Sequence, residues 1–141
     1  APIYPVTDTS KPYPSYDQFR DGYLLTHDSM VWFDAAYAAE KEHVRASPLL
    51  GRVDGLPPAV VVTASLDPLR DQGRAYAGAL IAAGVPTIFR EAVGTIHGFI
   101  TLRRAIPSGV GDVAGMLSVL RGVVAEAEAE RVMAQAAGAE A

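Results

Sequence analysis

An aspartate and a histidine stand shortly after two strand-like apolar runs of this sequence. Asp67 follows the run 59–64, and His97 follows the run 87–92, 30 residues further along the chain. An imidazole titrates close to neutral pH, so it can take a proton from a nucleophile and return it to a leaving group. A carboxylate on its other nitrogen fixes the tautomer and stabilises the imidazolium that forms. The two residue types therefore suit the acid and the base of a nucleophilic hydrolase.

The nucleophile is the third part that this chemistry needs. In strand-helix hydrolases a serine sits in a Gly-x-Ser-x-Gly turn, and none of the seven serines of the chain lies in such a turn. The absence of cysteine excludes a thiol nucleophile, a disulfide framework and a Cys-ligated zinc site. The sequence therefore offers an acid and a base without a nucleophile.

Other interpretations of the same residues stay open at this stage. Asp67-Pro68 after a strand is also typical of a helix N-cap, and a single loop histidine such as His97 is often only a surface residue. Asp71 could supply the carboxylate instead, although its place inside a helix favours pairing with Arg70 or Arg74. A metal site is disfavoured because no second histidine stands at ligand spacing, and we expect no metal or organic cofactor.

Composition limits the partners that we expect. A chain of 141 residues, half of them hydrophobic, suits one domain with a buried core. The net charge is -4 and the 12 basic residues are scattered along the chain without forming a long run, which disfavours nucleic acid or an anionic membrane and favours a small neutral ligand. The start lacks a basic region followed by a long apolar stretch, and no run approaches the ~18 apolar residues of a membrane span. We therefore predict a cytoplasmic protein.

Two strands and the helix between them must position the acid and the base. The run 59–64 is apolar on both faces, as a parallel strand covered by helices on both sides must be. A helix is predicted from about Pro68 to a stop at Gly84, and the charges of 87–92 place that strand nearer an edge. This order predicts an α/β fold with parallel strands and helices on both faces. The ends of both strands then lie at one rim, where the aspartate and the histidine meet.

The remaining elements are predicted around this unit. Residues 3–6 form a short apolar strand, 7–26 are mostly loop, a helix capped by Thr26 spans about 28–40, and a last helix spans about 110–133. The helical stripes that we expect to be buried are Met30, Phe33, Ala36, Tyr37 and Glu40 in the first helix, Leu69, Gly73, Tyr76, Ala77, Leu80 and Ile81 in the middle one, and Val110, Val113, Leu117, Leu120, Val124 and Ala127 in the last. His27 and His43 lie in polar contexts and are expected to be solvated.

Several short motifs together resemble one family. They are Ile3-Tyr4-Pro5-Val6, Gly22-Tyr23-Leu24-Leu25-Thr26, Ala46-Ser47-Pro48-Leu49-Leu50, Asp67-Pro68-Leu69-Arg70-Asp71, Ala83-Gly84-Val85 and His97-Gly98-Phe99. In this order they are similar to the C-terminal half of the hormone-sensitive-lipase-like α/β-hydrolases, the bacterial family IV carboxylesterases. The resemblance covers nearly the whole chain as one portion of a single domain.

The resemblance implies a function and its residues. Asp67 would be the triad acid and His97 the triad base in the hydrolysis of small neutral, short-chain esters through an acyl-enzyme, without a cofactor. Residues 7–27 would contribute to the cap over the substrate. Gln72 departs from the glutamate common in the family, a small change that we expect on the helix surface or near the acid loop.

The larger departure concerns what the 141 residues lack. The family's His-Gly-Gly-Gly oxyanion loop and Gly-Asp-Ser-Ala-Gly nucleophile turn are not among them, so we expect the chain alone to be inactive. We expect it to pair with the missing half or to self-associate through the bare sheet edge beside residues 3–6. Leu66, Ile96 and Phe99, together with Ile100, are candidate substrate contacts that could equally be core. The alternative functions are a non-catalytic binding or oligomerisation module and another acyl chemistry on the same fold.

Overall fold

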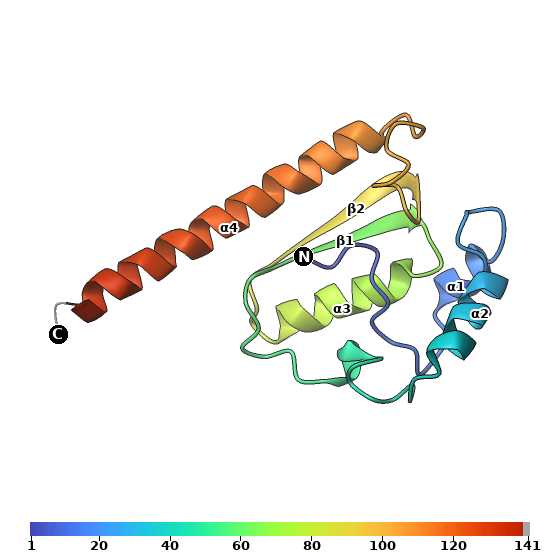
Figure 1. Cartoon of the computed structure of the whole chain (residues 1–141), viewed down its shortest axis with the longest axis horizontal. Helices are drawn as coiled ribbons and strands as arrows, with labels where there is room; N and C mark the ends of the chain where they lie inside the picture. The colour runs from blue at the N-terminus through green and yellow to red at the C-terminus, as the bar shows by residue number, and fades with distance from the viewer. Residues whose placement is uncertain (140–141) are drawn as a thin grey trace.

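The centre of the molecule is a pair of parallel strands joined by one helix. The computed structural model describes residues 1–139. Strand β1 (Ala59–Leu66) pairs in parallel with β2 (Thr87–Ile96), in a register that runs from Ala59 opposite Thr87 to Ala64 opposite Ala92. Helix α3 (Arg70–Ala82) makes the crossover between them (Figure 1). The predicted parallel α/β arrangement is therefore confirmed.

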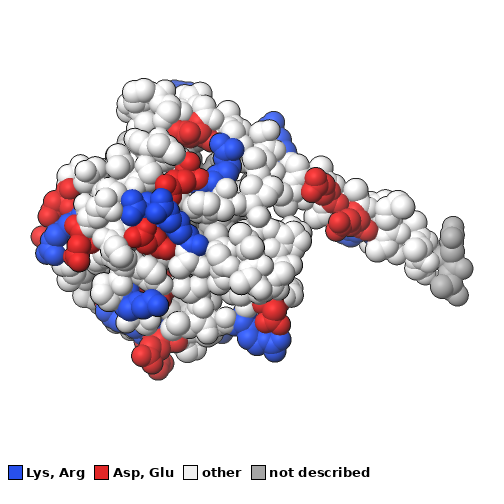
Figure 2. Space-filling model, turned by 180° about the vertical axis from the view of Figure 1, so that it is seen from behind, with Lys and Arg blue, Asp and Glu red and all other residues white. Residues whose placement is uncertain are grey.

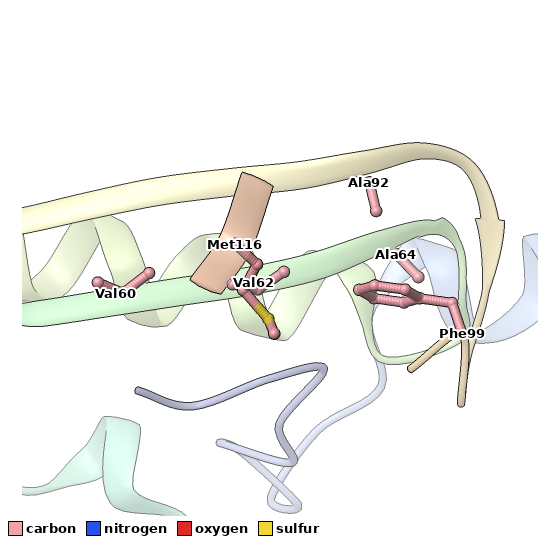
Figure 3. Packing of buried hydrophobic residues seen from close by; sticks show 6 residues of the cluster. All are labelled: Val60, Val62, Ala64, Ala92, Phe99 and Met116. Carbon is pink, nitrogen blue, oxygen red and sulfur yellow. The ribbon is translucent and has the colours of Figure 1, made fainter. Parts of the chain in front are cut away.

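Helices cover both faces of this sheet, as predicted. Alternate residues of β1 point to opposite faces: Val60 and Val62 belong to one hydrophobic cluster and Val61 to another. The first cluster is closed by Met116 of α4 (Gly109–Ala139), as Figure 3 shows, and the second by Leu80 of α3.

The N-terminal segment reaches β1 with a single residue. Ile3 forms an isolated parallel bridge with Val62, in which the N–H of Tyr4 donates to the carbonyl of Val62 at 2.7 Å. The predicted strand over residues 3–6 is therefore wrong in extent. Tyr4 has a positive φ of 36°, and Pro5 has no N–H to donate, so the ladder cannot continue.

The helix boundaries follow the expected signals closely. Helix α2 (His27–Tyr37) begins with a capping box, in which the hydroxyl of Thr26 accepts from the N–H of Ser29. Helix α3 ends in a Schellman motif, because Gly84 has φ 78° and the N–H of Val85 donates to the carbonyl of Leu80 at 3.0 Å. Two short helices lie in segments predicted as loop or connection: α1 (Pro14–Gln18) and the 3-10 helix η1 (Pro48–Leu50). Both are too short to show a helical period in the sequence.

The predicted buried stripes are only partly correct. In α2 only Met30 is buried, whereas Phe33 and Tyr37 are 56% and 70% exposed. In α3 the end of the stripe, Ile81, is exposed. In α4 the residues that pack on the sheet are Val113, Met116, Val119, Leu120 and Val123, whereas Val110, Leu117 and Val124 are exposed. The second half of α4 extends past the sheet and has no surface to bury against (Figure 1).

Charged groups are mixed on the visible surface. On the face seen in Figure 2, basic and acidic side chains lie beside one another and do not form a broad area of one sign. Within residues 1–139, no helix is both long and apolar enough to cross a membrane.

Candidate functional site

The structure brings Asp67 and His97 into hydrogen-bonding contact at the carboxyl ends of the two strands. Nδ1 of His97 lies 2.8 Å from Oδ2 of Asp67. The Asp67 side chain is 1% exposed, whereas that of His97 is 25% exposed. An ionised carboxylate only accepts hydrogen bonds, so the proton of this contact belongs to Nδ1 and Nε2 is left free. The predicted meeting of these two residues is confirmed.

The second oxygen of Asp67 fixes the turn into α3. Oδ1 accepts the N–H of Leu69 at 2.8 Å, and the carbonyl of Asp67 accepts the N–H of Arg70 at 3.0 Å. This is an Asx turn before the helix, whose N-cap is Leu69, so Asp67 is not the N-cap that an Asp-Pro pair was also expected to provide. One carboxylate therefore holds both the turn and the imidazole, because its two oxygens have different partners.

Two glycines shape the backbone around His97. Gly94 and Gly98 have φ 75° and 78°, a region that glycine adopts without strain. The N–H of Gly94 donates to the hydroxyl of Ser65 at 2.8 Å, and the pairing of the strands shifts register between Ala64 and Leu66. The irregular ladder carries β2 up to the residue before His97, so the histidine follows the strand directly.

Asp71 is excluded as the partner of His97. Its carboxylate accepts the N–H of Ser15 at 2.9 Å and the Nε–H of Arg70 at 2.8 Å, with Arg74 3.4 Å away. Burial by itself raises the pKa of Asp71, but the hydrogen bonds and charges of these neighbours hold that pKa below its ordinary value. The predicted pairing with the two arginines is confirmed, and the helix is tied by this carboxylate to α1.

Gln72 is buried, so of its two expected places the helix surface is wrong, whereas its position in the first turn of α3 leaves it near the acid loop. It is 2% exposed, and its Oε1 accepts the N–H groups of Thr7 and Asp8 at 2.7 and 3.0 Å. Its own carbonyl accepts the hydroxyl of Thr7 at 2.8 Å. Gln72 therefore anchors the segment that carries Tyr4 to the helix that follows Asp67.

Tyr4 is a residue of the site that the sequence analysis did not single out. Its ring centroid lies 4.4 Å from that of His97, with an interplanar angle of 57°. Burial, and secondly the charge of Asp67, raise the pKa of Tyr4 above its ordinary value, so its phenol is uncharged at neutral pH. The only signal for Tyr4 in the sequence is its position within the predicted strand 3–6, because its contact joins residues that are 93 positions apart.

A cavity of about 840 Å³ lies beside His97. The imidazole and Tyr4 are on its wall, with α2 contributing Phe33 and Tyr37. The wall is mostly apolar and aromatic, which suits a neutral ligand. It also carries charged side chains, those of Asp8, Lys11, Asp34, Lys41 and Arg45, and the further lining residues include Ile3, Val6, Tyr16, Leu25 and Met30.

None of the four candidate substrate contacts lines this cavity, and Ile100 packs against the same hydrophobic cluster as Phe99. Phe99 is 0% exposed and belongs to the hydrophobic cluster under the sheet, and Leu66 and Ile96 pair with each other at the ends of the two strands. The structure thus assigns Phe99 to the core, and substrate contact by Leu66 or Ile96 stays a prediction.

The two remaining histidines make no hydrogen bond to this pair within residues 1–139. His43 is exposed as expected, with its Nδ1 accepting the N–H of Arg45. His27 is not fully solvated, because its side chain is 26% exposed and packs edge-on against Tyr16. Within the part of the chain that the structure describes, no three His, Asp or Glu side chains gather as a metal site would require.

Comparison with known families agrees with the fold. Residues 1–101 match the alpha/beta hydrolase fold family, so the chain belongs to that family. Lipases and carboxylesterases are among its relatives, which confirms the predicted kinship with the hormone-sensitive-lipase-like esterases.

Individual relatives are similar over most of this chain. It is 42% identical over 104 residues to the ethyl acetate hydrolase of Pseudomonas putida, covering 71% of this chain and 33% of that protein. It is 37% identical over 115 residues to Lipase 2 of Moraxella sp., covering 79% of this chain and 26% of that protein. The crystal structure of EstE1, a thermophilic carboxylesterase from a metagenomic library, superposes with a TM-score of 0.78 at 35% identity, covering 86% of this chain and 43% of EstE1. The chain thus spans between 26% and 39% of the length of curated relatives that it matches.

Proposed function

We propose that this chain supplies the general base and its orienting acid for the hydrolysis of small neutral carboxylic esters. The observation that carries the proposal is the 2.8 Å contact between a buried Asp67 and a partly exposed His97 at the wall of a largely apolar cavity. Relatives that include an ethyl acetate hydrolase and Lipase 2 support the substrate class.

The chemistry follows from which nitrogen of the imidazole is free. Nε2 of His97 takes the proton of a serine hydroxyl as the oxygen attacks the ester carbonyl, and then returns it to the departing alkoxide. A water molecule repeats the cycle on the acyl-enzyme, which releases the acid and regenerates the serine. The carboxylate of Asp67 keeps Nδ1 protonated and stabilises the imidazolium in both half-reactions.

The serine nucleophile comes from outside residues 1–141 in this proposal. Ser15 and Ser47, the buried serines, donate to the carbonyls of Pro68 and Lys41, and no Gly-x-Ser-x-Gly turn is present. In a triad hydrolase of another family, loss of the nucleophile lowers turnover by about 10⁶-fold. We therefore expect the chain by itself to be inactive and to act together with the polypeptide that carries the nucleophile and the oxyanion loop.

The segment 7–27 is proposed to form part of the cover over the substrate. Asp8, Tyr16 and Leu25 from this segment line the cavity together with residues of α2. Asp8 is held by hydrogen bonds from Ser10 and Tyr13, so this cover has a defined local structure.

The test is ester hydrolysis by an assembly of this chain with a polypeptide that carries the family's Gly-Asp-Ser-Ala-Gly turn and oxyanion loop. We expect hydrolysis of p-nitrophenyl acetate, and we expect His97→Ala to lower kcat by at least about 10³-fold. His43→Ala is the matched control, since His43 is exposed and lies outside the cavity wall. Equal rates for the wild-type and His97→Ala assemblies would remove His97 from the mechanism.

A non-catalytic binding module is the second candidate, favoured by the exposed aromatic side chains of α2. Trp32, Phe33 and Tyr37 are between 56% and 70% exposed. In that case the assembly forms but no ester is hydrolysed, so the same experiment separates the two functions.

A further inference from the structure

Tyr4 holds a backbone conformation that tyrosine rarely adopts. Its φ is 36°, in the left-handed region that favours glycine. The residue stands between two restraints of the backbone: its N–H donates to the carbonyl of Val62 at 2.7 Å, and Pro5 follows it. Such strain persists where the surrounding structure imposes it, and it concentrates at functional sites. A tyrosine at this position therefore calls for a role of its side chain.

The ring of Tyr4 fills the space between a fixed wall and the imidazole of His97. On one side it meets Phe99 edge-on, with ring centroids 5.7 Å apart and an interplanar angle of 74°. Phe99 is 0% exposed within the core cluster, so this side cannot move easily. On the other side the Tyr4 ring lies 4.4 Å from the imidazole.

The hydrogen bond to Asp67 alone does not fix the orientation of the imidazole. That bond holds one ring atom, Nδ1, and leaves the ring free to rotate about it. The position of Nε2 depends on this rotation, which the bond alone does not restrict. A base must keep its nitrogen within hydrogen-bonding reach of the proton it takes, and misplacement by about 1 Å lowers rates by as much as about 10²-fold. A second contact on the face of the ring removes this freedom.

We propose that Tyr4 is a positioning residue for His97, which holds the imidazole plane so that Nε2 stays at the cavity wall. The inference rests on the proposed role of His97 as the general base. We assign this role to the aromatic ring and not to the hydroxyl. The hydroxyl of Tyr4 makes no hydrogen bond within residues 1–139, and the phenol is uncharged at neutral pH because its pKa is raised.

The first test follows the Nδ1 proton of His97 by NMR in the chain as it stands. In wild type and in Tyr4→Phe we expect a downfield Nδ1–H resonance protected by Asp67. In Tyr4→Leu we expect its exchange with solvent to quicken by at least about 10-fold, because the unsupported ring opens more often. Tyr76→Leu is the matched control, since Tyr76 packs against the cluster of Val61 and Leu80, on the opposite face of the sheet from Tyr4.

A second variant guards against misfolding. Tyr4→Gly removes the ring, and glycine adopts a positive φ without strain. We therefore expect this variant to fold even if Tyr4→Leu does not. Far-UV circular dichroism confirms folding for each variant. Unchanged exchange in a folded Tyr4→Leu or Tyr4→Gly overturns the positioning role while leaving the Asp67–His97 pair intact. A missing Nδ1–H resonance in the wild type overturns the pair itself, and with it the proposed function.

Kinetics of the assembled enzyme provide the second test. We expect Tyr4→Leu to lower kcat by about 10-fold to about 10²-fold with KM within about 2-fold, and Tyr4→Phe to restore kcat. A change confined to KM would make Tyr4 a substrate contact and overturn the positioning role.

Discussion

Replacement of the buried Gln72 by methionine should destabilise the chain more than the same replacement of a glutamine on the surface. The side chain of Gln72 is 2% exposed, and its Oε1 is the acceptor for the N–H groups of Thr7 and Asp8, which are 1% and 2% exposed. Methionine has nearly the same volume but no comparable acceptor. Two buried donors are then left unpaired at about 1–2 kcal/mol each, so we expect a loss of about 2–4 kcal/mol.

A loss of this size is large for a domain whose total stability is about 5–15 kcal/mol. Equilibrium unfolding in urea, followed by far-UV circular dichroism, measures it as a lower midpoint at constant slope. Gln72→Glu keeps an acceptor for both N–H groups, so its loss should be less than half that of the methionine variant.

Gln135→Met is the matched control, because Gln135 is exposed on α4 and should change stability by less than about 0.5 kcal/mol. A change that small for Gln72→Met as well would refute the claim that this side chain anchors the N-terminal segment.

Three further predictions concern the acid, a tight helix contact and acid pH. In the assembled enzyme, Asp67→Asn should lower kcat by about 10⁴-fold with little change in KM, because an amide favours the wrong tautomer of its imidazole partner; a loss below about 10-fold in steady-state assays would contradict this role. Gly73→Ala places a Cβ 2.6 Å from Cγ2 of the buried Thr63 and should destabilise by about 1–3 kcal/mol. Gly78→Ala on the same helix meets nothing within 4 Å and should stabilise by about 0.5–1 kcal/mol, so equal effects in urea unfolding would contradict the close packing. The pKa of Glu91 is lowered: burial raises it, but hydrogen bonds from an arginine and a threonine outweigh that effect. The stability that Glu91 contributes is thus present above the unfolded-state pKa of about 4.3 and is lost as pH falls through the lower folded-state pKa, so Glu91→Gln should flatten the acid limb of stability against pH, and an unchanged limb would contradict it.

The strand-helix-strand unit could be predicted because its signals are local. The apolar run 59–64, the Gly84 stop and the Thr26 cap each depend on neighbouring residues, and each is found where expected. The meeting of Asp67 and His97 followed from the same unit, because parallel strands bring their carboxyl ends to one rim.

The parts that the sequence did not reveal depend on distant contacts. The burial of Gln72 comes from a segment 65 residues away that needs its amide as an acceptor. Tyr4 contacts His97 because the neighbouring Ile3 forms a bridge with Val62 of β1. The strand expected over residues 3–6 does not continue past Tyr4, whose φ is positive. The exposed aromatic residues of α2 show the limit of an amphipathic pattern: it identifies the apolar face of a helix, but it does not identify the element that packs against that face.

The central claim is that His97, oriented by Asp67, activates a serine contributed by another part of the enzyme. Labelling by a fluorophosphonate tests this directly, because the reagent reacts with an activated serine whatever the preferred ester. We predict that the polypeptide carrying the nucleophile is labelled when combined with the wild-type chain, and that it stays unlabelled alone or with the His97→Ala chain. Labelling at the same rate with the His97→Ala chain would contradict the account.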